Sequence, residues 1–291
     1  MIKTNYLSVI IIWCTTPLAI QWSIQSGMLF GLMSRLSLGL LVLAIIYVFS
    51  KQKLQFNKVN SMAFIAVGIG IYFSMLFVYM SAQYIPSGWI SVIFGLSPII
   101  TGVFSIIFLN ENHFTKCKTI GMLLGLSGLI VIFYTSSELA ATKVLGVFLM
   151  LTSTIAHAGS AVIVKKINAP ITGKQSTFGG LLIAVPLIIL TFVISGHQMG
   201  ELTPRSIGSI IYLGAIGTAA GFSMYYYILK KLDAIKVSLI ALVSPVIALI
   251  LGIILNNEPF SMSIVIGGVL IISGLALFES YDKKSQAVKE I

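Results

Sequence analysis

The sequence predicts an all-α integral membrane protein with ten transmembrane helices arranged as two inverted five-helix repeats. The prediction rests on the composition, on ten long apolar runs and on a similarity between the two halves. Of the 291 residues, 57% are hydrophobic and 9% are charged, whereas about a quarter of the residues of a soluble domain are charged. Since one span needs about 20 apolar residues, this length holds about ten spans joined by short loops. It leaves no room for a soluble catalytic domain.

The spans follow from the apolar runs that lie between polar breaks. The first run lacks a small-residue cleavage site, so we expect a retained helix rather than a signal peptide. We divide the chain into residues 1–137 and 138–291, one repeat each. The first five expected helices cover residues 6–24, 28–49, 61–80, 87–109 and 117–135. The second five cover residues 144–164, 176–194, 207–229, 235–255 and 262–278.

The basic residues predict the orientation of these spans. If the N-terminus is cytoplasmic, every lysine except Lys143 falls on the cytoplasmic side, and Arg205 falls outside. Basic loops are retained in the cytoplasm during insertion. We therefore expect a multi-pass protein of the cell (inner) membrane with both termini in the cytoplasm. The same distribution explains the net charge of +10 without a nucleic-acid partner, because nucleic-acid binding needs basic residues clustered on one folded face.

A short pattern in the first half recurs in the second. Ser97-Pro98 followed by Asn110-Glu111 returns, at an offset of 147, as Ser244-Pro245 followed by Asn257-Glu258. Because each half has an odd number of expected spans, the second copy enters the membrane in the opposite orientation. Inverted repeats of this kind are typical of secondary transporters. The alternative is that the repeat records only the duplication of a stable bundle, as in a channel or a membrane enzyme.

Several longer motifs resemble one known family. They are Trp13-Cys14-Thr15-Thr16-Pro17, Arg35-Leu36-Ser37-Leu38-Gly39, Leu96-Ser97-Pro98, Phe108-Leu109-Asn110-Glu111, Val243-Ser244-Pro245 and Leu255-Asn256-Asn257-Glu258-Pro259. In this order and spacing the chain resembles the drug/metabolite transporter superfamily, specifically its ten-helix EamA-type branch, over nearly its whole length. The resemblance implies a central cavity lined mainly by helices 1, 3, 4, 6, 8 and 9. It also implies alternating access by the two halves, often for export of amino acids or related metabolites.

The first expected helix carries a candidate cavity wall. Trp13, Thr16, Pro17 and Gln21 recur at helical spacing, so that a ring, a hydroxyl and an amide share one stripe. Pro17 frees a backbone carbonyl one turn earlier. The alternative is that Pro17 only kinks the helix and that Trp13 only packs.

Two ionisable side chains fall inside expected spans. His157 lies near the middle of the sixth helix, where the family often has an aromatic residue, and Ser153 and Ser160 share its face. It could couple protons or bind a substrate carboxylate, or it could be a neutral histidine bonded to a neighbouring helix. Arg35 lies about two turns inside the second helix, where it could attract an anionic group. The alternative is that it reaches outward to the membrane surface or caps helix carbonyls.

Aromatic and amide side chains complete the candidate lining. Tyr79 and Gln83 share one face of the third helix, and Trp89 follows at the start of the fourth. Tyr225 and Tyr226 belong to a run of three consecutive tyrosines, of which at most two can face a cavity. The alternative is an interfacial belt or core packing.

We expect the two Ser-Pro pairs to bend their helices, because proline interrupts the hydrogen-bond ladder and serine can satisfy the freed backbone. Ser97, Pro98, Ser244 and Pro245 are thus candidate kinks that shape the cavity and allow bending, as is Pro17. Glu111 and Glu258 fall at the ends of spans, where we interpret them as turn anchors rather than proton carriers.

Missing motifs narrow the function. The chain has no ATP-binding glycine-rich loop with its lysine, no HExxH and no GxSxG, so neither direct ATP drive nor hydrolysis has visible machinery. We expect no enzyme activity, no cofactor and no metal. The sequence predicts a secondary transporter that exports small organic metabolites through the lipid bilayer, with proton coupling a further hypothesis, as a monomer or homodimer. The alternatives are a channel, a scaffold or enzyme, or a carrier of anionic, phosphorylated metabolites.

Overall fold

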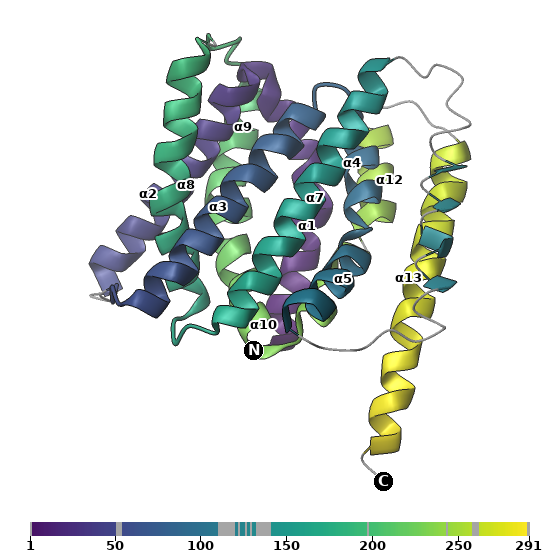
Figure 1. Cartoon of the computed structure of the whole chain (residues 1–291). Coiled ribbons are helices and arrows are strands. Elements are labelled where there is room, and N and C mark those ends of the chain that lie inside the picture. The colour runs from purple at the N-terminus through teal and green to yellow at the C-terminus, as the bar shows by residue number, and fades with distance from the viewer. Residues whose placement is uncertain are drawn as a thin grey trace.

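The computed structural model is a bundle of helices that stand side by side (Figure 1). It describes residues 2–50, 54–109, 120–131 apart from 122, 126 and 129, 141–196, 198–242, 244–257 and 262–289. All regular elements of these residues are helices. In the first half they are α1 (Ile2–Ser23), η1 (Ile24–Ser26), α2 (Met28–Ser50), α3 (Lys58–Ser81), α4 (Ser87–Phe94) and α5 (Ser97–Leu109). The later elements are α7 (Ala141–Ile167), α8 (Gly173–Ser195), α9 (Pro204–Tyr212), η2 (Leu213–Phe222), α10 (Ser223–Lys231), α11 (Ala234–Ser238), η3 (Leu239–Leu242), α12 (Ser244–Asn256) and α13 (Met262–Lys289).

Seven helical stretches in the described ranges are long and apolar enough to cross a membrane. Two shorter apolar helices, Ile247–Asn256 and Val265–Gly274, lie where the ninth and tenth spans are expected. Most of the expected fifth helix, with Glu111 before it, lies outside the described residues, as does Glu258. The prediction of an all-helical, multi-pass membrane protein is confirmed, whereas the count of ten helices and the inverted repeat stay predictions.

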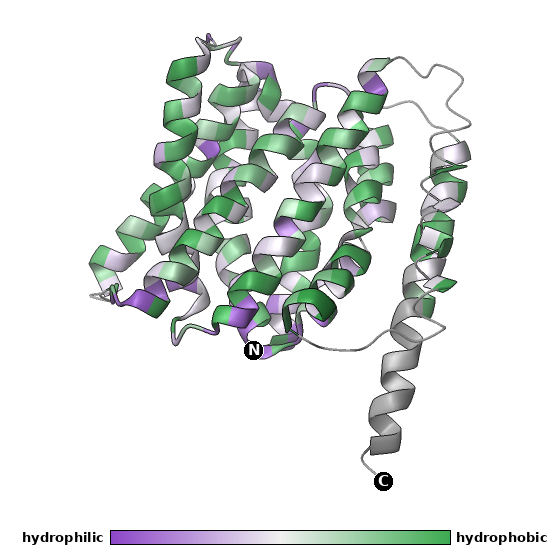
Figure 2. Cartoon of the chain, viewed as in Figure 1, coloured by the Kyte–Doolittle hydropathy of each residue, from purple (hydrophilic) through white to green (hydrophobic). Residues whose placement is uncertain are grey.

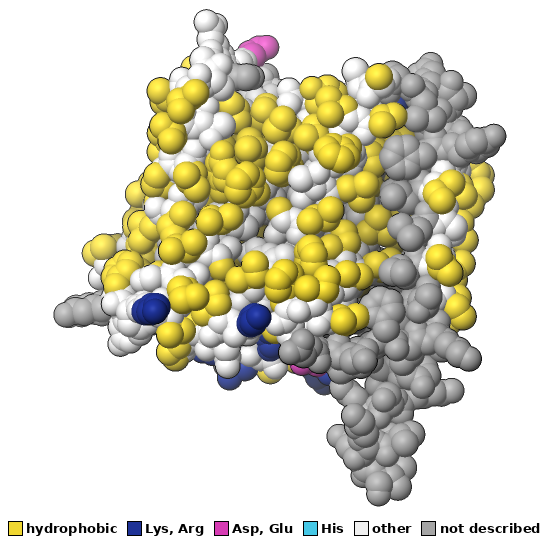
Figure 3. Space-filling view, viewed as in Figure 1, with side chains coloured by type: hydrophobic (Ala, Val, Ile, Leu, Met, Phe, Trp, Pro, Cys, Tyr) yellow, Lys and Arg dark blue, Asp and Glu magenta, His cyan; other side chains and the backbone are white. Residues whose placement is uncertain are grey.

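The outer surface of the bundle is apolar. Leu190, Val193 and Ile194 at the end of α8 are 55%, 68% and 75% exposed, and apolar residues run along the lengths of the helices (Figure 2). Side chains of this kind facing water would be costly, but facing lipid they are expected. On the visible face, Lys and Arg side chains gather at the edge where the N-terminus lies (Figure 3).

The centre of the bundle is built on the close contact of α3 and α7. The Ser153 hydroxyl donates to the Ser74 carbonyl at 2.7 Å, and the Ser160 hydroxyl donates to the Ala66 carbonyl at 2.9 Å. Gly70 lets the two backbones approach, because a Cβ there would collide with the Ser160 side chain. Small residues and interhelical hydrogen bonds are what hold helices together in lipid, where no hydrophobic force acts between them.

The two halves of the chain pack against each other through several pairs of elements. In one direction α3 packs on α7 and α8, and α5 packs on α7. In the other, η2 with its flanks packs on α1 and α2, and α12 packs on α1. Further contacts between the halves join α2 to α8, α4 to α12 and α5 to α11.

Two spans are interrupted at their Ser-Pro pairs. α4 ends at Phe94 and α5 begins at Ser97, so that Pro98 takes the second position of a new helical segment. Proline is accommodated there because its missing N–H has no intrahelical partner in the first turn. In the second half α12 begins at Ser244, with Pro245 in the same position. A third irregularity is η2, a π-helix of ten residues inside the eighth span.

Candidate functional site

A cavity opens among the helices of both halves and encloses about 620 Å³ of non-atom space, open solvent included. Its walls come from α1, α2, α3, α4, α7 and η2, and we call it the central cavity. Apart from α2, these are the first, third, fourth, sixth and eighth expected helices; among the described residues, the ninth contributes none. The lining residues are Trp13, Thr16, Pro17, Ile20, Arg35, Ser74, Met75, Val78, Ile90, Ser91, Phe94, Met150, Ser153, His157, Gly217 and Phe222.

Three rings of the lining, Trp13, Phe94 and His157, pack with Tyr225 behind them, and we call these four the aromatic cluster. The Trp13 ring lies 5.5 Å from Phe94, 5.5 Å from His157 and 5.1 Å from Tyr225, between ring centroids. His157 is 5.2 Å from both Phe94 and Tyr225. The cluster joins rings from both halves. It gives the central cavity an aromatic wall suited to a flat or apolar solute or to a cation.

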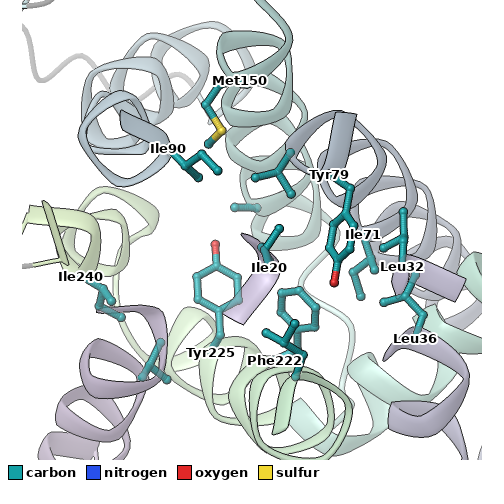
Figure 4. Packing of buried hydrophobic residues seen from close by; sticks show 14 of the residues in the cluster. Ile20, Leu32, Leu36, Ile71, Tyr79, Ile90, Met150, Phe222, Tyr225 and Ile240 are labelled. Carbon is teal, nitrogen blue, oxygen red and sulfur yellow. The ribbon is translucent and has the colours of Figure 1, made fainter. Parts of the chain in front are cut away.

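Apolar side chains from four elements complete this wall. Figure 4 shows Ile20, Ile90 and Met150 around the space toward which the Tyr225 hydroxyl points, with Phe222 beside it. All but Tyr225 are lining residues of the central cavity. The cavity is therefore mainly apolar, as small-molecule sites are, with a few polar groups to fix orientation.

The hydroxyls of the lining fall into two classes. Thr16 donates to the Ile12 carbonyl at 2.7 Å, and Ser153 donates to the Ser74 carbonyl. These hydroxyls are satisfied by the protein itself. Ser91 on α4 is 2% exposed and its Oγ has no hydrogen-bond partner.

His157, 9% exposed, has ring contacts but no hydrogen bond to another described residue. Both interpretations of His157, a role in transport and a neutral structural histidine, stay predictions.

Arg35 is a buried charge in the wall of the central cavity. Only 2% of the residue is exposed, so it does not reach outward to the membrane surface. Its Nε donates to the Thr218 hydroxyl in η2 at 3.0 Å, and its Cζ lies 6.0 Å from the centre of the Tyr79 ring. Its Nη1 has no hydrogen-bond partner.

Other predicted residues lie outside the lining. Gln21 donates to the carbonyls of Ala82 and Ile85, at 2.9 and 2.7 Å, and so ties α1 to the turn between α3 and α4. Gln83 is exposed, and Trp89, near the start of α4, is buried in the core.

The remaining predicted residues serve neighbouring contacts. Tyr79 is fully buried, and its hydroxyl accepts a hydrogen bond from Ser23 at 3.1 Å. Tyr226 packs its ring edge on Tyr225, 5.2 Å between centroids. It also lines a second, smaller cavity at the end of the bundle that carries Lys165 and Lys230. Ser160 belongs to the contact of α3 with α7.

The sequence reasoning missed Ser91 and Phe94 as lining residues. Both lie on α4, whose regular turn ends at Gly95, so helical spacing carried over the whole fourth span does not predict which of its faces looks inward. In the described part of the chain, no cluster of three or more His, Cys, Asp or Glu side chains could hold a metal ion.

Known proteins agree with this architecture. The profile of the EamA-like transporter family matches residues 5–134 and again residues 144–279. An uncharacterized transporter of Archaeoglobus fulgidus is 31% identical over 213 residues, which are 72% of each chain. The uncharacterized transporter YoaV of Bacillus subtilis is 26% identical over 283 residues, 94% of this chain and 95% of that protein.

A protein of known crystal structure superposes with a TM-score of 0.72 at 16% identity, over 96% of this chain and 98% of that one. At this identity the likeness concerns the fold alone. The fold, the central cavity and the two profile matches lead to one conclusion, which is that the chain belongs to the EamA-like transporter family.

Proposed function

We propose that this protein is a secondary carrier that exports small organic metabolites, amino acids or related amphipathic solutes, by alternating access. The observation that carries the proposal is the central cavity, whose walls come from both halves of the chain. A site between two halves can be opened to either side of the membrane by moving one half against the other.

Three features support alternating access. Trp13 and His157 lie near the middle of α1 and α7, the depth at which secondary transporters bind substrate. The contacts of α3 and α5 with the second half of the chain resemble those of η2 and α12 with the first half. The family profile matches twice, in ranges close to the proposed repeats of residues 1–137 and 138–291. Two half-structures of similar build can adopt each other's conformation, which is the basis of the alternation.

The lining favours solutes that are partly apolar. Rings and aliphatic side chains form most of the wall, and Arg35 is its one charged residue among those described. A phosphorylated metabolite carries two or more negative charges and would need several basic side chains in so dry a place. This favours amino acids and similar solutes over phosphorylated ones.

The orientation that we propose places both termini in the cytoplasm of an inner membrane. Lys165 and Lys166 end α7, Lys174 begins α8, and Lys230 and Lys231 end α10. All belong to the end of the bundle at which α1 begins (Figure 1). Lys143 at the start of α7 lies at the opposite end, but a concentration of lysines at one end is typical of a cytoplasmic side.

Counterflow in proteoliposomes tests the carrier. Vesicles are loaded with unlabelled amino acids and related metabolites, one at a time, and uptake of the same labelled solute is followed. We expect saturable exchange with a subset of the solutes, and a channel would instead give flux that does not depend on solute on the opposite side. An imposed proton gradient, applied to wild type and to His157→Ala, tests proton coupling. If folded protein exchanges none of the solutes, the proposal fails for this substrate class.

A further inference from the structure

Arg35 poses a physical problem that the fold alone does not solve. It lies seven residues after the start of α2, about 10 Å along the helix axis at 1.5 Å per residue. A charged side chain at such depth is costly unless it is paired. Among the described residues no carboxylate forms a salt bridge with it, and the lining of the central cavity contains no Asp or Glu.

The guanidinium is held in place on one side and lacks a hydrogen bond on the other. Its Nε is fixed by the Thr218 hydroxyl at 3.0 Å, and the Tyr79 ring lies beside it. Gly217 has no side chain, and a Cβ there would lie 3.5 Å from Nη2. The Nη1 atom remains without a hydrogen bond although the residue is 98% buried. Both glycine and threonine belong to η2, and π-helical turns are rare and frequently found at functional sites.

A second buried polar group in the wall of the central cavity, the Ser91 hydroxyl, also lacks a hydrogen-bond partner. Ser91 lines the central cavity from α4, is 2% exposed, and its Oγ has no partner. Thr16 and Ser153 differ, because their hydroxyls donate to backbone carbonyls. Buried polar groups in native proteins are nearly always hydrogen-bonded, and each exception calls for an explanation. A bound solute is an explanation that serves Arg35 and Ser91 together.

We propose that Arg35 is the carboxylate-binding residue of the central cavity, and that the transported solutes are monocarboxylates with an apolar or aromatic body. This inference deepens the proposed function. The statement that these solutes are transported rests on that function, whereas the binding of a carboxylate by Arg35 does not. The carboxylate accepts from Nη1, since a guanidinium matches the planar carboxylate better than any other side chain. The aromatic cluster holds the rest of the solute, and Ser91 offers one further hydrogen bond. One buried arginine balances one negative charge.

The test compares acids with their amides, which have nearly the same shape but lack the carboxylate charge; the amide of 3-phenylpropionate is uncharged, and the two amino-acid amides keep only the ammonium group. Purified protein in nanodiscs is titrated with L-phenylalanine, L-leucine and 3-phenylpropionate, each beside its amide, while the midpoint of thermal unfolding is measured. A ligand that binds only the folded state raises this midpoint. We expect wild type to bind at least one acid about tenfold or more tightly than its amide, the range of a charge-assisted hydrogen bond. In Arg35→Gln this preference disappears while the uncharged 3-phenylpropionamide binds as before.

Two further variants keep the outcome decisive. Arg35→Lys retains the charge but lacks the planar guanidinium, so we expect a reduced preference for acids. It takes the place of Arg35→Gln in the test if that variant does not fold. Arg205→Gln removes the other arginine of the chain, which is exposed on α9 and stacked on Trp22, and should leave the preference unchanged. If no acid is preferred in wild type, or if Arg35→Gln keeps the preference, the proposal is overturned.

Counterflow of the same pairs separates this proposal from the transport function. Acid binding that depends on Arg35, without exchange of any solute, would support the carboxylate site and overturn transport. Exchange of acids and amides alike, with no effect of Arg35→Gln, would support transport and overturn the carboxylate site.

Discussion

Trp13 is the residue on which the aromatic cluster converges. Its ring is within 5.5 Å of the rings of Phe94, His157 and Tyr225, while the three come from α4, α7 and α10. A side chain in this position fixes the width of the central cavity and offers its own face to a solute. Its effect should therefore appear in binding rather than in folding.

We predict that Trp13→Ala raises the half-saturating solute concentration in counterflow by about two- to tenfold, the factor that corresponds to the 0.5–1.5 kcal/mol of an aromatic contact. Trp22→Ala is the matched control. Trp22 bonds to Asn256 and stacks on Arg205 away from the central cavity, so the same truncation should leave half-saturation unchanged. Equal values for wild type and Trp13→Ala would contradict a role of this ring in the site.

Some residues of the site could be predicted from the sequence, and the reason is regularity. α1 is one uninterrupted helix, so the spacing of Trp13, Thr16 and Pro17 predicts that they share a face, and all three line the central cavity. Gln21 shares the stripe but bonds backbone carbonyls of the turn between α3 and α4. Helical spacing gives the direction of a side chain but not which neighbour it meets. Trp89 was likewise predicted to line the cavity, but it is buried outside the lining.

At the level of elements, the crossings of helices depend on glycines. A Cβ on Gly68 of α3 would lie 2.7 Å from the carbonyl oxygen of Gly180 and 2.7 Å from the Ile183 Cβ in α8. The carbonyl belongs to the backbone, so the two helices would have to move apart. Gly39 makes the corresponding approach of α2 to Thr218 and Gly214.

We predict that Gly68→Ala destabilises the fold by about 1–3 kcal/mol, as overpacking does. The measurement is the thermal unfolding midpoint of detergent-solubilised protein, followed by size-exclusion chromatography. Gly208→Ala in α9 is the control, since a Cβ there meets no atom within 4 Å, and alanine favours the helix over glycine. Its midpoint should stay or rise. If the unfolding midpoint falls in both variants, or in neither, the close approach of the helices does not determine the stability change.

The eighth span shows why its tyrosines could not be assigned from the sequence. Helical spacing assumes 3.6 residues per turn, but η2 bonds i to i+5 over Leu213–Phe222, just before Tyr225 and Tyr226. The side chains after η2 therefore point in other directions than a regular α-helix continued from α9 would give them. Only the structure shows that Tyr225 meets Trp13 and that Tyr226 faces the second cavity.

For the whole molecule, the composition and the apolar runs were enough to predict a multi-pass helical fold. Both are properties that a bilayer imposes on any chain that crosses it. The interruptions inside spans, between α4 and α5 and in η2, were harder to predict in detail, because the neighbouring helices determine them. Ser97-Pro98 was the one local signal, and it marks where α5 begins.

The orientation leads to a prediction of its own. In a background with Cys14→Ala and Cys117→Ala, single cysteines replace Lys174 at the start of α8 and Glu201 in the segment between α8 and α9, both exposed. A membrane-impermeant maleimide should label Glu201→Cys in intact cells, and Lys174→Cys only after the cells are permeabilised. The reverse pattern would mean that the termini lie outside and that the positive-inside argument fails for this chain.

The lysines at one end of the bundle also connect the protein to its lipids. Each lysine near an anionic headgroup surface is attracted by about 1 kcal/mol, and Lys58, Lys166 and Lys174 are exposed at that end. The opposite end has few such charges. If the two halves rock against each other, only one end moves its lysines relative to the headgroups. The fraction of anionic lipid in the surrounding leaflet then shifts the equilibrium between the two access states.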